Sequence, residues 1–427
     1  MSVPDDALYI SPEQLCVGLF VHLDIPWLDH PFSFNSFKIK NEAQIRTLRA
    51  LKLKRIRYDP DRSDSAPYPH RPEPEAAPQD EAPAVPPDDP ILAAKRQRIE
   101  LLQQHRQELS RIEQAYLKAA DAMRSINRKL QQNPVAVAEE ANQLVAQMVE
   151  VFLSKADITL QAMGNSPDSA EIYFHSLNVS ILCLMLARGL GLSAEDSHHL
   201  GMGALLHDMG LVEIPDRILR KIEPLTQAEN NLRRMHCEYG VNMGVRMGLP
   251  QPVLRIIAQH HEMQDGSGFP KGLRGEAVDP LARIVAVVNH YDNLCNPIDV
   301  NKALTPHEAL SQMFAQARNR FDSNTLQLLV RSLGVYPPGS IVRLSNETVG
   351  LVSSVNPRKP LRPWLVVYDP EVPANEAIML DLEQETDINI SAALRPSQLP
   401  PEIVEYLSPR KRVTYYFDGA GEKTNKP

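Results

Sequence analysis

The stretch Leu200-Gly-Met-Gly-Ala-Leu-Leu-His207-Asp208 joins an apolar helical pattern to an adjacent imidazole and carboxylate. A second apolar run, Val179 to Ala187, belongs to a helix that is apolar nearly all round, which indicates a central, buried helix. This run is far too short to cross a bilayer, which needs ~20 residues. The two runs predict a mainly α protein in which a His–Asp pair lies at the end of a core helix. The alternative for the pair is a cationic histidine that stabilises a helix C-terminus.

Histidine is concentrated around this pair, since nine of the thirteen histidines lie between His175 and His307. Imidazole and carboxylate are the usual ligands of transition metals, and multinuclear sites of this kind mostly hydrolyse phosphoesters. Glu171 and His175 are four residues apart, so on a helix they share a face and can reach one metal. Neighbouring helical side chains diverge by ~100°, so the rings of His260 and His261 can serve two different metals.

Simpler roles compete for some of these residues. Glu171 has the spacing of a capping partner for Asp168. His236 is expected on the helix that begins at Thr226, where it would otherwise be a half-exposed surface histidine. We assign four histidines to solvated or packed positions outside the site: His198, His199, His290 and His307.

The segment Asp265-Gly-Ser-Gly-Phe-Pro-Lys-Gly272 is a loop by composition. Its glycines, Gly268 among them, let the backbone approach a ligand closely. Phe269 is expected to stack on a base, and Lys271 and Arg274 to meet phosphate. A tight connection without a ligand is the alternative.

The bulk composition limits the function classes. A net charge of −8 gives no electrostatic footprint for a long nucleic acid. Four widely spaced cysteines indicate a reduced, cytoplasmic protein, and the N-terminal residues lack the apolar segment of a signal peptide. At 427 residues the chain is too long for one core, so several domains are expected.

The fold class that we expect is an all-helical bundle, preceded by a small α/β domain and followed by a small β-rich domain. The expected parts are a small α/β domain, a disordered Pro-rich linker, a long helical segment, a metal phosphohydrolase domain, a small β domain and a tail, at residues 1–62, 63–90, 91–165, 166–335, 336–418 and 419–427.

Within these parts we expect strands at Leu15 to Leu23 and Lys54 to Tyr58, with a helix after Asn41 between them. A helix over 91–130 either forms a homodimer or packs on the core, and a second runs from Pro134 to about Met163.

Taken together, these residues resemble the HD-GYP family, a group of HD-domain metal phosphohydrolases that degrade the bacterial second messenger cyclic di-GMP. The family's HD pair is His207-Asp208, and its HHE…DGxGYPxGL motif is His260-His261-Glu262…Asp265-Gly-Ser-Gly-Phe-Pro-Lys-Gly-Leu273. The match covers about residues 166–303. Residues 7–60 look like the small domain that often precedes such units.

The resemblance implies an HD-type helical bundle that binds two or three divalent metals, often iron or manganese. It implies hydrolysis of cyclic di-GMP to pGpG, or further to GMP, with His207 and Asp208 as catalytic residues. The implied metal ligands are Glu171, His175, His207, Asp208, His236, His260, His261 and the residue at Asn289. The implied substrate contacts are Gly268, Phe269, Pro270, Lys271 and Lys302.

The chain departs from the family pattern at three positions. Leu211 replaces the lysine of HDxxK, Asn289 replaces an aspartate ligand, and Phe269 replaces the tyrosine of GYP. Lys302 is the main cation left from a basic segment. These losses support a second hypothesis, a non-catalytic cyclic di-GMP sensor or a scaffold for other signalling proteins. A third, a mononucleotide phosphohydrolase, is disfavoured by the Gly-Phe-Pro loop.

Overall fold

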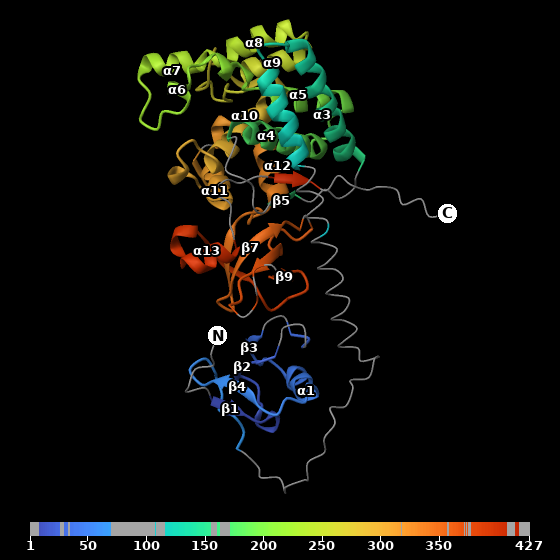
Figure 1. Cartoon of the computed structure of the whole chain (residues 1–427), viewed down its shortest axis with the longest axis vertical. Coiled ribbons are helices and arrows are strands. Elements are labelled where there is room, and N and C mark those ends of the chain that lie inside the picture. The colour runs from blue at the N-terminus through green and yellow to red at the C-terminus, as the bar shows by residue number, and fades with distance from the viewer. Residues whose placement is uncertain are drawn as a thin grey trace, which may run out of the picture. The chain divides into compact units, whose positions relative to one another are not determined.

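The computed structural model describes residues 8–25, 30–32, 35–69, 107, 116–154, 160–162, 171–316, 318–356, 358–370, 372, 374, 377–407 and 415–417. The chain divides into two compact units, Met1–His105 with Asp369–Glu376, and Arg106–Tyr368 with Ala377–Pro427 (Figure 1). Most of the expected linker, and most of the helix expected over 91–130, lie outside the described residues, although 116–129 are helical.

The first unit contains an antiparallel sheet in the order β1-β4-β2-β3 and one described α-helix, α1 (Glu42–Ala50). The strands are β1 (Leu8–Ile10), β2 (Phe20–His22), β3 (Ser36–Lys38) and β4 (Ile56–Asp59). The helix expected after Asn41 is confirmed, because the Asn41 side chain accepts a hydrogen bond from the Gln44 amide and α1 buries Ile45 and Leu48.

The strand expected from Leu15 to Leu23 is wrong in its extent. A 3-10 turn, η1 (Pro12–Gln14), precedes it, and Gly18 adopts a φ of 97° in a turn. Val17 is therefore exposed, and the strand starts only at Phe20. The closing strand is also shifted, since β4 ends at Asp59.

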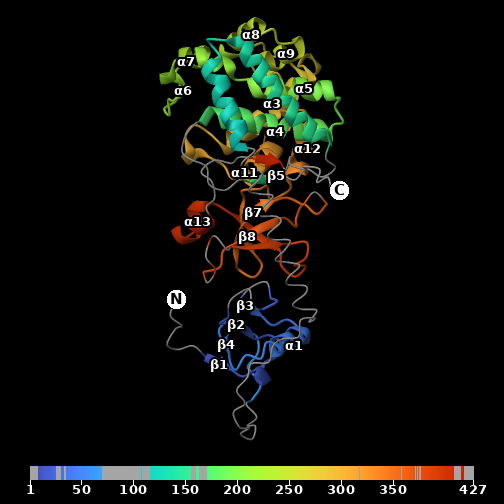
Figure 2. The ribbon, with the colours of Figure 1, turned by 45° about the vertical axis from the view of Figure 1, so that its right-hand side comes forward.

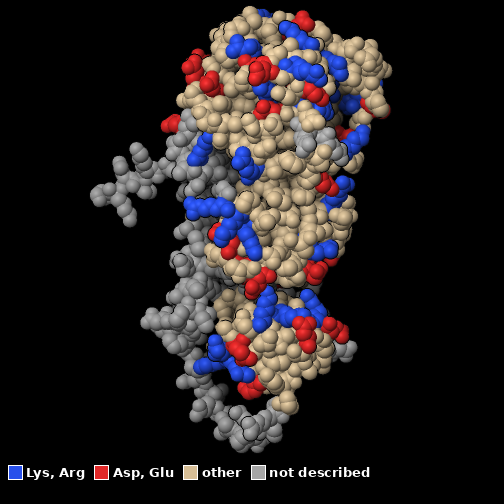
Figure 3. Space-filling view, turned by 180° about the vertical axis from the view of Figure 1, so that it is seen from behind, with Lys and Arg blue, Asp and Glu red and all other residues tan. Residues whose placement is uncertain are grey.

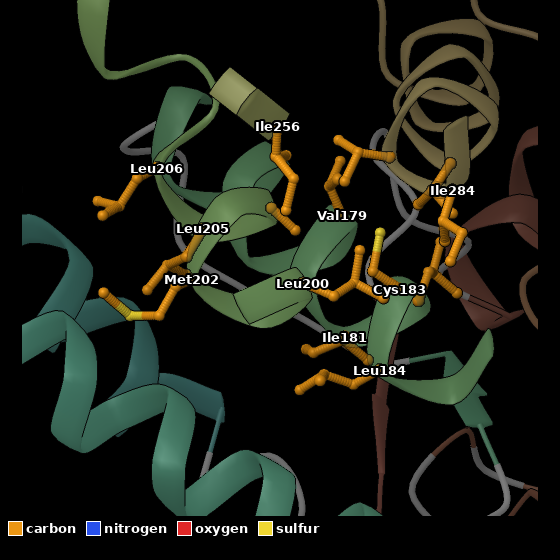
Figure 4. Close-up of a cluster of buried hydrophobic side chains, with 14 of the residues drawn as sticks. Val179, Ile181, Cys183, Leu184, Leu200, Met202, Leu205, Leu206, Ile256 and Ile284 are labelled. Carbon is orange, nitrogen blue, oxygen red and sulfur yellow. The ribbon is translucent and has the colours of Figure 1, made fainter. Parts of the chain in front are cut away.

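Helices dominate the second unit, and α4 (Glu171–Gly189) is central among them. It packs against α3 (Pro134–Ser154), α5 (Ala194–Leu206), α10 (Pro280–Cys295) and α12 (Ser323–Leu333). Figure 4 shows Val179, Ile181, Cys183 and Leu184 of α4 meeting side chains of α5, such as Leu200, with Ile256 and Ile284 nearby. Burial of each large aliphatic side chain contributes about 1.5–3 kcal/mol. The prediction of a buried central helix is confirmed.

Shorter elements connect and extend this bundle: η3 (Met209–Glu213), α6 (Asp216–Leu219), α7 (Gln227–Arg234), α8 (His236–Arg246), α9 (Gln251–Gln259), η4 (Gly275–Ala277), η5 (Val300–Lys302), α11 (Pro306–Gln316) and η6 (Arg318–Arg320). The predicted start signals hold where they are described. Ser193 caps α5, Thr226 forms a capping box with Glu229, and Thr305 does the same with Glu308. Asp168 lies outside the described residues.

A sheet follows the helices, as the β-rich sequence predicts, with strands β6 (Ile341–Leu344), β7 (Val349–Ser354), β8 (Trp364–Val367), β9 (Ile378–Asp381) and β10 (Ile390–Leu394). The helix η8 (Pro396–Gln398) and α13 (Pro401–Leu407) come next. Two further strands, β5 (Leu160–Ala162) and β11 (Tyr415–Phe417), join the same sheet through β7. The second helix expected up to Met163 is thus wrong at its end, because α3 stops at Ser154 and a strand follows.

Along the chain β5 lies between α3 and α4, and Figures 1 and 2 show it at the end of the helical bundle that faces β7. On the face drawn in Figure 3, acidic side chains are interspersed among the basic ones over the helices. Among the described helices, none has the length and apolar character needed to cross a bilayer.

Candidate metal centre

Three helix ends and one helix interior supply the histidines of the predicted site. His207 is the C-cap of α5 and His260 the C-cap of α9, with Asp208 and His261 directly after them. His175 lies within α4. His236 is the first residue of α8, so its expected place on the helix begun by Thr226 is wrong, because that helix, α7, ends at Arg234.

A close backbone approach brings Asp208 and His236 together. A Cβ atom on Gly210 would overlap the carbonyl oxygen of His236 and the amide nitrogen of Gly240. Only glycine allows this contact between η3 and α8. The turn that carries Asp208 therefore lies directly against the start of α8.

The ligand atoms gather in two groups that share one residue. Within each group the atoms lie within 4.8 Å of one another. The four-residue group contains Asp208, His236, His260 and His261, and the three-residue group contains His175, His207 and Asp208. His260 and His261 both belong to the four-residue group, so this geometry places them together, and the idea that they serve different metals stays a prediction. Because α9 ends at Gln259, the helical divergence of neighbours does not apply.

Asp208 faces both groups with its two carboxylate oxygens. Its Oδ2 lies 3.3 Å from His207 Nε2 and 3.7 Å from His175 Nε2. Its Oδ1 lies 3.4 Å from His236 Nε2 and 3.6 Å from His260 Nε2. One carboxylate therefore faces both groups of possible ligands.

Backbone carbonyls fix the tautomers of three imidazoles. The Nδ1 atoms of His207, His236 and His260 lie 2.8, 2.6 and 2.8 Å from the carbonyl oxygens of Ala204, Arg233 and Ile257. A carbonyl only accepts, so each Nδ1 carries the proton and each Nε2 presents a lone pair. His175 is oriented in the same way by the buried carboxylate of Asp292, at 2.6 Å from its Nδ1.

The inward lone pairs then face one another. His236 Nε2 lies 3.2 Å from His260 Nε2, and His175 Nε2 lies 3.3 Å from His207 Nε2. Two lone pairs at such distances repel, and a cation between them removes the repulsion. Neutral imidazole with carboxylate is also the donor set of divalent transition metals. The described residues therefore fit a metal centre.

Burial sets the protonation of the cluster. It lowers the pKa of His236, lowers that of His260 to about 4, and holds that of His261 well below its usual value. Burial raises the pKa of Asp208, but the neighbouring imidazoles, His207 first, outweigh it and hold that pKa well below its usual range. Most of the set is thus in the form that binds metal, with neutral rings and an ionised carboxylate.

His175 differs from the other imidazoles. Burial lowers its pKa, but the hydrogen bond and charge of Asp292 outweigh burial, so the pKa is raised. A proton on His175 would satisfy the lone pair of His207 until a cation displaces it.

The Gly-Phe-Pro loop is attached to the same site. The buried Glu262 accepts hydrogen bonds from the amides of Lys271 and Leu273, at 2.7 and 2.8 Å. A Cβ atom on Gly268 would overlap the carbonyl of His261 and the amide of Met263. The ring of Phe269 stacks on that of His261, with centroids 4.4 Å apart. The loop therefore lies on the His260–His261 turn, where it can shape a pocket beside the cluster.

The other predicted residues lie as follows. Glu171 is the first residue of α4, and its side chain is outside the described part. Asn289 is buried on α10, and its Oδ1 accepts a hydrogen bond from Asn293 at 2.6 Å. Lys302 is exposed, with its ammonium 3.5 Å from Asp299. Pro270 and Lys271 are exposed.

The four histidines left out of the site stay outside both groups. His198 contacts Asn142, and His307 contacts the carbonyl of Val335. His290 packs against Phe321. His199 belongs to the middle of α5.

Two residues that matter to the site were not assigned to it from the sequence, Glu262 and Asp292. Asp292 follows Asn289 by three positions on α10, which puts both on one face of the helix. Glu262 directly follows the paired histidines. These spacings were the available signals for both residues.

Comparison with known proteins agrees with this geometry. Residues 139–325 match the family described as HD domain, and residues 8–141 match a Domain of unknown function (DUF3391). The helical bundle and its His–Asp cluster thus define an HD-domain protein.

Named relatives show to which group of HD-domain proteins the chain belongs. Cyclic di-GMP phosphodiesterase PA4108 of Pseudomonas aeruginosa is 30% identical over 362 residues, which cover 84% of each chain. The cyclic di-GMP phosphodiesterase response regulator RpfG of Xanthomonas campestris is 39% identical over 149 residues, 34% of this chain and 39% of that one. A 3'3'-cGAMP-specific phosphodiesterase 2 of Vibrio cholerae is 27% identical over 217 residues, 46% and 42% of the two chains. This chain belongs to the HD-GYP family of cyclic dinucleotide phosphodiesterases, and the resemblance of its motifs is confirmed.

Proposed function

We propose that this chain is a metal-dependent phosphodiesterase that hydrolyses cyclic di-GMP to the linear dinucleotide pGpG, with GMP as the product of a second cut. The observation that carries the proposal is the position of Asp208, whose two oxygens face two groups of histidines with inward lone pairs. The names of the two most similar relatives described above support the choice of cyclic di-GMP.

The ligands divide between two cation positions. His175, His207 and Asp208 would hold one cation, with Glu171 and Asn289 beside them, while Asp208, His236, His260 and His261 would hold the other. Two divalent transition metals such as iron or manganese, once bound, supply an activated water and neutralise charge on the scissile phosphate.

The protein's own groups hold and orient this centre. Asp208 stays ionised and shares its charge between the two positions, and the carbonyl contacts keep three imidazoles in the tautomer that can ligate. Burial excludes water from His207 and His260, both fully covered. The loop of Gly268 to Lys271 would then receive the nucleotide next to His261.

The test is hydrolysis by protein purified and loaded with iron or manganese without oxygen. Chromatography of the products should show pGpG from cyclic di-GMP, and both His207→Ala and His260→Ala should abolish turnover. Metal-loaded wild-type protein that leaves cyclic di-GMP intact would contradict the proposal. A panel with 3'3'-cGAMP and mononucleotides would define the substrate.

A second function, binding of cyclic di-GMP without hydrolysis, is favoured by Asn289. Its amide is a weaker ligand than carboxylate, and its oxygen already accepts a hydrogen bond from Asn293. If this function is correct, wild-type protein binds the nucleotide without turnover. The double variant Asn289→Asp with Leu211→Lys should then gain hydrolysis. No gain in that variant would argue against a loss of activity at these two positions.

A further inference from the structure

The family's phosphate-binding lysine is replaced here by an apolar side chain. Leu211 lies on η3, half-buried, three residues after Asp208. A cyclic dinucleotide carries two phosphodiester charges. If the metal positions take the scissile phosphate, the other one still needs a cation, and Leu211 cannot supply it.

A free guanidinium lies at the edge of the same site. Arg234 is the last residue of α7, two positions before His236. Its Cζ lies 4.8 Å from the centroid of the Phe269 ring, and that ring stacks on His261. Arg234 and His261, a member of the four-residue group, thus contact the same aromatic side chain.

Within the described structure, the guanidinium of Arg234 has a cation–π contact but no ion pair. Its side chain is exposed, and none of the carboxylates described in the structure forms an ion pair with it. Two of the other cations considered for substrate contact are engaged, since Arg274 donates to the carbonyl of Asp265 and Lys302 lies beside Asp299. Lys271 is exposed on the loop itself, and none of the aromatic rings described in the structure contacts its ammonium to fix its position.

Arg234 is also held in place. Glu229 closes the capping box of α7 with Thr226 and accepts two hydrogen bonds from Lys221, at 2.7 and 2.9 Å. These contacts anchor the start of α7, and the cation–π contact with Phe269 positions the guanidinium at its end. A group held this way loses little freedom when it binds a ligand.

We propose that Arg234 binds the non-scissile phosphate of a cyclic dinucleotide, in place of the cation that is missing at Leu211. The assignment rests on the proposed function and adds a specificity residue to it. A planar guanidinium suits this task, because it can donate two parallel hydrogen bonds to one phosphate.

The experiment compares Arg234→Ala and Arg234→Lys with Arg246→Ala in the full-length, metal-loaded protein. Arg246 is the matched control, an exposed arginine at the end of α8. Each protein is assayed with cyclic di-GMP and with bis(p-nitrophenyl) phosphate, a diester with a single phosphate. Metal content is measured for every variant.

Arg234→Ala should raise KM for cyclic di-GMP roughly 10- to 100-fold, as expected for a lost charge-assisted hydrogen bond, with little change in kcat. Arg234→Lys should recover part of this loss. Hydrolysis of bis(p-nitrophenyl) phosphate and metal content should match the wild type, because neither involves a second phosphate. A merely structural role would disturb those two readouts as well.

The outcomes separate this assignment from the proposed function. Wild-type protein that cleaves cyclic di-GMP, with Arg234→Ala unchanged in KM, overturns the role of Arg234 alone. Equal losses on both substrates overturn it too. If the wild type binds without cleaving, the same comparison is made on Kd. Wild-type protein that neither binds nor cleaves overturns both proposals.

Discussion

Asp292 orients the metal centre without belonging to either ligand group. Its Oδ2 lies 2.6 Å from His175 Nδ1, and its Oδ1 accepts hydrogen bonds from Asn178 and Asn296 at 2.9 and 3.0 Å. Because the carboxylate is fully buried, its position is fixed by these polar contacts. The direction of His175 Nε2 therefore depends on a residue 117 positions away.

Asp292→Asn should weaken metal binding or hydrolysis by about 10- to 100-fold, the usual cost of losing the hydrogen-bond partner of a ligating histidine. Titration with limiting manganese, followed by elemental analysis, measures the effect. Asp216→Asn is the control, because that carboxylate is exposed and 3.9 Å from Arg220. Equal metal content in the Asp292 variant and the wild type would show that Asp292 has no such role.

In the presence of EDTA, the free energy of unfolding of the metal-free protein should fall as the pH drops from about 6.5 to 4. Burial, helped by the charge of Arg320, lowers the pKa of His290 to about 4. The unfolded chain takes up this proton near its usual pKa of ~6.5 and the folded chain only later, so folding is penalised within that window. Each such histidine contributes at most about 1.4 kcal/mol per pH unit.

His290→Gln should make that decline less steep, as measured by urea unfolding in EDTA at pH 7.5 and pH 5. At pH 7.5 neither state carries the proton, so the variant's value there gives the cost of the substitution itself. An unchanged difference between the two pH values would contradict the assignment to His290.

The sequence predicted the members of the two groups better than their grouping. Paired histidines and the His–Asp dipeptide are local patterns, so His175, His207, Asp208, His236, His260 and His261 could be named in advance. That His260 and His261 share a group, and that Asp292 faces His175, depends on the packing of α4, α9 and α10. No local pattern carries that information.

At the scale of elements, the contact of η3 with α8 leaves no room for a side chain at Gly210. At Gly210 the obstacle to a Cβ atom is backbone of His236 and Gly240, which cannot turn aside. At Gly189 it is the tip of the Leu328 side chain, which can change rotamer. Gly189→Ala is therefore a control for Gly210→Ala.

Gly210→Ala should reduce the free energy of unfolding by about 1–3 kcal/mol, in the range of overpacked sites, and should displace His236 from Asp208. Metal affinity should fall with it. Gly189→Ala should cost less and leave metal affinity unchanged. Chemical denaturation and metal titration of both variants measure this, and equal metal affinity in the two would contradict the expectation.

Element prediction succeeded where capping residues mark a helix start and failed where no residue marks a boundary. Met235 keeps helical dihedral angles, with φ −63° and ψ −14°, and it ends α7 and precedes α8. Without Gly or Pro at the junction, the sequence reads as one helix. The strand β5 has only three residues, too few for an alternating pattern to emerge.

Considered as a whole, the molecule contains separate cores. Ile10, Leu19, Ile45 and other residues of the first unit form one cluster, whereas the helices of the second unit form another. Both metal groups belong to the second unit. Metal binding should therefore stabilise one unit directly and leave the other as it is.

Added manganese should raise the melting temperature reported by Trp364 and leave that reported by Trp27 unchanged. By sequence, Trp27 belongs to the first unit and Trp364 to the second. At a manganese concentration one hundred times Kd, the free energy of unfolding of the second unit should rise by about 2.7 kcal/mol. Single-tryptophan variants, Trp27→Phe and Trp364→Phe, report each unit alone, and EDTA should reverse the shift. A common shift in both would mean that the units melt together.

The position of β5 affects how the protein is made. This strand leaves the ribosome between α3 and α4, while its partners in β7 and β11 are still to be translated. The helices that are made first can therefore pack while the backbone N–H and C=O groups of β5 have no partner strand. Those groups form their hydrogen bonds only after β7 and β11 have been translated, near the end of synthesis. A nascent chain stalled before β7 should consequently be more easily nicked by protease around residues 160–162 than the released protein.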